Sequence, residues 1–286
     1  EEYLTAVRLS PGLSRARLNL GSAYAPFAIN GDPSRPDFSV PNVGQTSATE
    51  ARRLSDRTLL RQNLDTLERS FDKEGELGAL DQFEGQAVTL LTNPKTRDAF
   101  DLAKEDDRTR DRYGRNRWGQ QLLLARRLVE AGVEIVTSQL TGPLCGRTGV
   151  WDDHAVDHHI FDVLRFRMGN YDRAVSALIE DIYARGLDQR VLVVVTGEFG
   201  RTPFAQGANG RDHNPFAFSI WLAGAGIKGG SVYGETDDYG YKVVENKLTD
   251  SHWFIECMER GGKIVFVERP AHLLRNLGAL FAALID

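Results

Sequence analysis

Five side chains that are able to bind a metal ion or an anion follow one strongly apolar stretch of this chain. They lie within sixteen positions and are Glu198, Arg201, Arg211, Asp212 and His213. Carboxylates and imidazoles are common ligands of divalent metals, and guanidinium groups bind anionic oxygens. This combination indicates a metal-assisted reaction on an anionic substrate, or a binding site for one.

A second group of candidates lies upstream, in the sequence WDDHAVDHH of residues 151–159. It brings three carboxylates and three imidazoles into eight positions, namely Asp152, Asp153, His154, Asp157, His158 and His159. Asp152 and His154 are two positions apart in a predicted loop, so both are able to turn inward as metal ligands. We expect His158 and His159 to begin the following helix and to face solvent.

The apolar run Val191–Val195 is the element that must position the first group. It is mostly β-branched and has no polar alternation, which is typical of a strand covered by helices on both faces. We therefore predict a central parallel strand. The candidate residues then lie at its carboxyl end, where open α/β sheets bind their ligands.

Hydrophobic spacing predicts the other elements. Helices are expected at about 49–71, 76–92, 116–131, 158–185 and 270–284, and strands at about 133–138, 216–223 and 263–268. Trp221, inside a predicted strand, is expected in the core. The alternation of strands and helices predicts an α/β domain of residues 47–286 with a mostly parallel sheet. The Pro-rich residues 1–46 are expected to form an extended arm packed on that domain.

Composition excludes several classes of protein. The chain has 286 residues and a net charge of -5, with mixed signs and no basic block, so nucleic acid is not an expected partner. No apolar run approaches the ~18 residues of a membrane span. There is no GxSxG elbow, P-loop or GxGxxG motif. The two cysteines are far apart in the chain and do not tell whether the protein belongs to an oxidising or a reducing compartment. The oligomeric state does not follow from the sequence.

Several motifs together resemble one protein family. They are LLARRLVEAGVEIVT (residues 123–137), WDDH (151–154), RGLDQRVLVVVTGEFGRTP (185–203), GRDH (210–213), LAGAGIKGG and VYGETDDYG. The chain is similar to a bacterial family of secreted proteins, domain of unknown function 1501, placed in the alkaline phosphatase and sulfatase superfamily. The resemblance implies a three-layer α/β/α sandwich of alkaline phosphatase type. It also implies export to the periplasm or the cell exterior.

The resemblance further implies a metal-dependent hydrolase of phosphate or sulfate esters, acting on a small molecule or a polysaccharide. Zinc or calcium would be held by Asp152, His154, Glu198 and His213. Asp212 would orient the imidazole of His213, and Arg201 or Arg211 would neutralise the anion in the transition state.

Two departures from the superfamily pattern keep alternatives open. Phe199 occupies a position where a ligating His or Asn is usual, and Asp152 and His154 are not four residues apart. Glu198 is therefore either a metal ligand or a salt-bridge partner of Arg201, and His213 is either a ligand or a surface residue. The alternative function is a non-catalytic binding or structural component of an extracellular assembly.

The nucleophile is not assigned. The family's N-terminal strand supplies a metal carboxylate and the nucleophile position, and no such segment is recognised before Glu1. Thr196 and Thr202 are interpreted as hydrogen-bonding residues of the turn, because a hydroxyl without an adjacent base or metal is a weak nucleophile. For a chain that begins at Glu1, we expect Asp152, Glu198 and His213 to converge in one cleft, with weak metal binding and no turnover.

Overall fold

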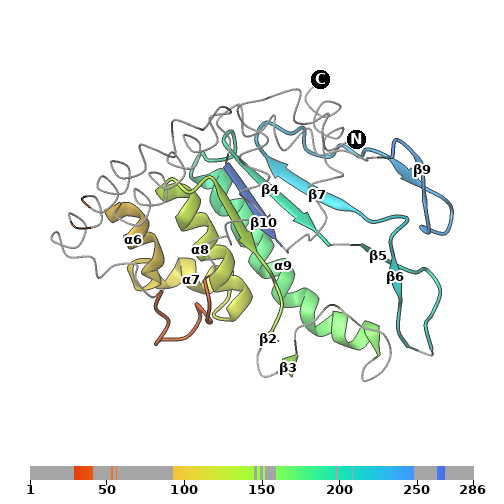
Figure 1. Ribbon diagram of the computed structural model, residues 1–286, viewed down its shortest axis with the longest axis horizontal. Helices are drawn as coiled ribbons and strands as arrows, with labels where there is room; N and C mark the ends of the chain where they lie inside the picture. Colours follow the sequence, from red (N-terminus) through yellow and green to blue (C-terminus); the bar gives the residue numbers. More distant parts are fainter. Residues whose placement is uncertain are drawn as a thin grey trace, which may run out of the picture. The chain divides into compact units, whose positions relative to one another are not determined.

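The computed structural model (Figure 1) describes residues 29–40, 53, 56, 93–144, 147–148, 151, 159–197, 199–207, 209–247 and 263–267. Contacts divide the chain into two compact units, residues 1–31 with 39–101, and residues 32–38 with 102–286. In the first unit, helix α6 (Pro94–Phe100) begins after Asn93, whose side chain accepts the Lys95 N–H. The helices predicted at 76–92 and 270–284, and nearly all of that at 49–71, lie outside the described residues.

A four-stranded mixed sheet forms the centre of the second unit. Its strand order is β1 (Ile135–Ser138), β10 (Lys263–Val267), β4 (Val191–Thr196) and β7 (Ile220–Gly224). Strand β10 is parallel to both β1 and β4, whereas β7 is antiparallel to β4. The strand predicted at residues 191–196 is therefore present as an interior strand, and the side chains of Val191 to Val194 are buried.

The predicted three-layer α/β/α sandwich of alkaline phosphatase type, with a mostly parallel sheet, is wrong. Strand β7 is antiparallel, and the other strand pairs of the described residues are short and antiparallel. They are β2 (Pro143–Leu144) with β3 (Arg147–Thr148), β5 (Gly200–Arg201) with β6 (His213–Asn214), and β8 (Glu235–Thr236) with β9 (Val243–Glu245). A second layer of helices is not among the described residues.

The connection between β4 and β7 explains the antiparallel direction. A parallel neighbour requires a crossover connection, usually a helix, whereas antiparallel strands can be joined by turns and hairpins. The chain leaves β4 through the β5–β6 pair and returns without a helix. Strand β7 lies at the end of the strand order, and Trp221 on it is 48% exposed, so its predicted place in the core is also wrong.

Three helices pack against one another beside the sheet: α7 (Asp107–Tyr113), α8 (Arg117–Ala131) and α9 (Ile160–Ala184). Helix α8 starts at Asn116, whose side chain accepts the Gly119 N–H, and it ends at Gly132 in a left-handed conformation. Its buried face packs on β1 and β10. None of the helices that the structure describes is both long and apolar enough to traverse a bilayer.

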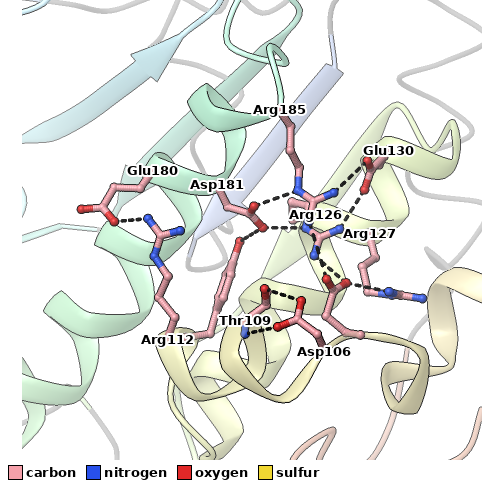
Figure 2. A network of polar contacts seen from close by, with 11 residues as sticks. Asp106, Thr109, Arg112, Arg126, Arg127, Glu130, Glu180, Asp181 and Arg185 are labelled. Carbon is pink, nitrogen blue, oxygen red and sulfur yellow. Dashed lines mark hydrogen bonds and ion pairs between the residues drawn. The ribbon is translucent and has the colours of Figure 1, made fainter.

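Buried ion pairs fix these helices to one another (Figure 2). The guanidinium of Arg126 on α8 lies 2.6 Å from Glu105 Oε2, 2.7 Å from Glu130 Oε2 and 2.9 Å from Asp181 Oδ2 on α9. Arg185 adds a contact of 2.7 Å to Asp181 Oδ1. Burial alone would lower the pKa of Arg126, but Asp181 and Glu105 outweigh it and raise the pKa. Helix α9, which leads into β4, is thereby held in place on α8.

Candidate functional site

The loop that follows β4 is a hairpin. Strands β5 and β6 place Arg201 opposite His213 and Gly200 opposite Asn214. The pairing continues beyond the strands, since the N–H of Thr202 donates to the carbonyl of Asp212 at 3.0 Å. Residues 199–203 of the motif GEFGRTP and the motif GRDH thus belong to the two arms of one hairpin, here called the site hairpin (residues 199–214). It lies at the carboxyl end of β4 (Figure 1).

Gly200 lets the site hairpin approach the chain segment that follows it. A Cβ atom at this position would lie 2.0 Å from the carbonyl oxygen of Ala217, a distance that no side chain tolerates. Asn214, which is buried, donates from Nδ2 to the carbonyl of Tyr241 at 2.8 Å. These contacts fix the base of the hairpin against the backbone that surrounds it.

Arg201 joins three segments of the chain. Its Nη1 donates to the carbonyl of Arg211 across the hairpin at 3.2 Å, and its Nη2 donates to the carbonyl of Trp151. The guanidinium carbon also lies 5.7 Å from the centre of the Phe199 ring. Through these two backbone carbonyls Arg201 acts as a positioning residue that ties residue 151 to the site hairpin.

Residues on either side of segment 152–158, which carries Asp152 and His154, are hydrogen-bonded to the site hairpin. Before it, Trp151 accepts the bond from Arg201. After it, the N–H of Ile160 donates to the carbonyl of Asn209 at 3.1 Å. The guanidinium of Arg211 adds a contact, 5.4 Å from the ring centre of Phe161. The segment itself lies outside the described residues, but its flanking residues both meet the hairpin that carries His213.

His213 packs against Phe199. Their ring centroids are 3.9 Å apart and the ring planes are inclined by 31°. The backbone N–H of His213 donates to Oδ1 of Asp212 at 2.8 Å, so that carboxylate contacts the main chain of the residue whose imidazole it was predicted to orient. His213 is exposed, and Asp212 is half-buried.

The described residues do not form a metal centre by themselves. No group of three or more His, Cys, Asp or Glu side chains is placed to hold a metal ion within the part of the chain that the structure describes. Asp152, His154 and Glu198 are outside that part, which leaves His213 with Asp212. Zinc or calcium binding by Asp152, His154, Glu198 and His213 stays a prediction.

Trp151 is a positioning residue whose role was not foreseen from the sequence. Its ring stacks on Trp118 of α8 at a centroid distance of 5.5 Å and an interplanar angle of 20°, and its Nε1 donates to the carbonyl of Leu140 at 2.7 Å. Trp151 therefore connects the site hairpin, through Arg201, to helix α8. The sequence feature that could have indicated this role is the position of the tryptophan directly before the segment rich in Asp and His.

Comparison with known families agrees with the motifs. The model of the family described as Protein of unknown function (DUF1501) matches residues 12–258, and the chain belongs to this family. No curated protein and no solved structure matches the chain. Strand β10, although an interior strand of the sheet, lies beyond the matched range.

Proposed function

We propose that this protein is a metal-dependent hydrolase of phosphate or sulfate esters, related in its chemistry to alkaline phosphatases and sulfatases. One observation carries the proposal: Trp151 and Ile160, on either side of segment 152–158, are both hydrogen-bonded to the site hairpin. That segment carries Asp152 and His154, and the hairpin carries His213 and directly follows Glu198. The chain therefore enters and leaves this segment beside the hairpin, which supports a shared site.

Asp152, His154, Glu198 and His213 are the residues that would hold the divalent metal, zinc or calcium. When bound, such a metal polarises an ester oxygen or activates a nucleophile. Arg201 keeps the hairpin and residue 151 together, so its contribution is to position the ligands. Arg211 lies on the same hairpin and is the candidate to bind the substrate anion. The proposal includes export from a bacterial cell and a small-molecule or polysaccharide ester as substrate.

Metal content and turnover test this proposal together. Elemental analysis of the purified protein is expected to find zinc or calcium, and aryl phosphates or aryl sulfates are expected to be hydrolysed. Glu198→Gln and His213→Gln should remove both metal and turnover. Asp162→Asn, an exposed carboxylate on α9, is the matched control and should change neither. A protein without metal and without turnover would contradict the proposal.

A second function is favoured by the contact between Phe199 and His213. The ring of a residue that cannot coordinate metal packs against the proposed ligand at 3.9 Å. This arrangement suits a non-catalytic binding or structural component of an extracellular assembly. The two functions differ in one measurement, because only the hydrolase loses an activity when Glu198 is replaced by Gln.

A further inference from the structure

A small pocket lies beside the site hairpin. It has a volume of about 290 Å³ and is lined by Pro203, Phe204, Asp237, Tyr239 and Tyr241. The first two residues belong to the site hairpin, and the other three belong to the turn between β8 and β9. We call it the aromatic pocket. It contains none of the residues proposed to bind the metal or the ester.

The walls of the aromatic pocket are aromatic rings in contact with solvent. Phe204 is 60% exposed and Tyr239 is 80% exposed. The ring centroids of Phe204 and Tyr241 are 6.0 Å apart, and the ring planes are inclined by 36°. Tyr241 also contacts Phe216, at a centroid distance of 5.4 Å. Exposed aromatic groups that gather around a depression in this way mark binding sites more often than isolated surface residues do.

The β8–β9 segment, which supplies three of the five lining residues of the aromatic pocket, is negatively charged. Asp237 is half-buried, and its Oδ1 accepts the Tyr241 N–H at 2.8 Å, which fixes the carboxylate in the pocket wall. Residues 235–245 contain four carboxylates and one lysine, a formal charge of -3. This environment repels an anionic ligand and attracts a cationic one.

We propose that the aromatic pocket binds an alkylammonium cation, such as a trimethylammonium group. The faces of Phe and Tyr rings carry negative electrostatic potential, and recognition of quaternary ammonium groups by clustered rings relies on it. Asp237 supplies a full negative charge beside them. The volume of about 290 Å³ suits a compact group better than a drug-sized ligand. The proposal goes beyond the ester hydrolase and does not depend on it.

Choline, titrated into the full chain in a calorimeter, is the probe. We expect saturable binding in the millimolar range. Tyr239→Leu removes a highly exposed ring, and Asp237→Asn removes the charge while keeping an oxygen for the Tyr241 N–H, so both variants should fold. Each is expected to weaken choline binding by about tenfold. The matched controls, Tyr183→Leu and Asp162→Asn, change exposed residues of α9 outside the pocket and should bind choline as the wild type does.

The neutral isostere 3,3-dimethyl-1-butanol separates recognition of charge from apolar burial. Choline binding without binding of this alcohol supports the proposal. Equal binding of the two, or choline binding that Tyr239→Leu and Asp237→Asn leave unchanged, would overturn it, as would the absence of saturable choline binding. A parallel titration with acetylated and amidated trimethyl-lysine tells whether a small molecule or a protein side chain is the better source of the cation.

Discussion

Phe199 and His213 face each other across the two arms of the site hairpin, with their ring centroids 3.9 Å apart. Strand pairing explains this proximity. Arg201 is paired with His213, and Phe199 lies two residues before Arg201, so it is on the same face of the strand as Arg201. The resemblance to the alkaline phosphatase and sulfatase superfamily predicted a metal-ligating side chain at position 199. The contact instead places an apolar ring beside His213.

Replacing Phe199 by His should strengthen metal binding. The new imidazole would lie next to His213, and an additional nitrogen ligand stabilises zinc, which prefers four ligands in tetrahedral geometry. We expect zinc affinity, measured by competition with a chromophoric chelator, to rise about tenfold. Phe216→His introduces the same side chain at an exposed position outside the site hairpin and should have no such effect. Equal affinities of the two variants would contradict the prediction.

Gly200→Ala should destabilise the site hairpin. The added methyl group would meet the Ala217 carbonyl oxygen at 2.0 Å, and the backbone would have to separate to accommodate it. A loss of about 2 kcal/mol in the free energy of unfolding is expected from such overpacking, measured by urea titration. Gly197→Ala is the matched control, since the nearest atom to its Cβ would be 3.4 Å away. A stable Gly200→Ala protein would show that the hairpin is held less tightly than the structure indicates.

Local features of the fold were predictable from the sequence. Helices α8 and α9 and strand β4 were found from hydrophobic spacing and from glycines at helix ends, since both signals act over a few residues. The closeness of GEFGRTP and GRDH followed from their positions in the chain. In these cases the residues that form the sequence pattern are also the residues that contact one another, and they are close together in the chain.

Features set by distant segments were not predictable. Strand β10 enters the sheet between β1 and β4, although it follows β4 by more than sixty residues. Trp221 is 48% exposed on β7, the last strand in the order, and the residues around it in the chain do not indicate that position. The bond from Arg201 to Trp151 joins residues fifty positions apart. Spacing along the chain contains no signal for such partners.

Arg126→Met should destabilise the helices beside the sheet. The substitution keeps the apolar stem but removes one cationic partner from Glu105 and from Asp181, whose side chains are only 8% and 9% exposed. Arg127 still pairs with Glu105 and Arg185 with Asp181, so we expect a loss of about 2 to 3 kcal/mol, below the ~3 to 5 kcal/mol of a buried charge left without any partner. Arg115→Met, which breaks exposed pairs with Asp107 and Asp111, should cost under about 1 kcal/mol. Urea titrations of both variants check the difference, and similar losses would contradict it.

Tyr113 should make the protein sensitive to alkaline pH. Its buried hydroxyl donates to Oδ2 of Asp181 at 3.0 Å. Burial raises the pKa of Tyr113, and the negative charge of Asp181 raises it further. The unfolded chain has the ordinary tyrosine pKa of about 10. Above that pH the unfolded state loses the proton while the folded state keeps it, so this contribution to stability is complete below about pH 10 and is lost as pH rises.

Tyr113→Phe removes both the hydrogen bond and the titrating group. At about pH 8 the variant should be less stable than the wild type by about 2 kcal/mol, the value of a buried hydrogen bond to a charged acceptor. At about pH 11 the difference should shrink by about 1 kcal/mol, because only the wild type is destabilised by ionisation of residue 113 in the unfolded chain. Urea titrations at the two pH values measure this change, and Tyr183→Phe, at an exposed position on α9, controls for the substitution. A difference that stays constant or grows with pH would show that Tyr113 is not held protonated by burial and Asp181.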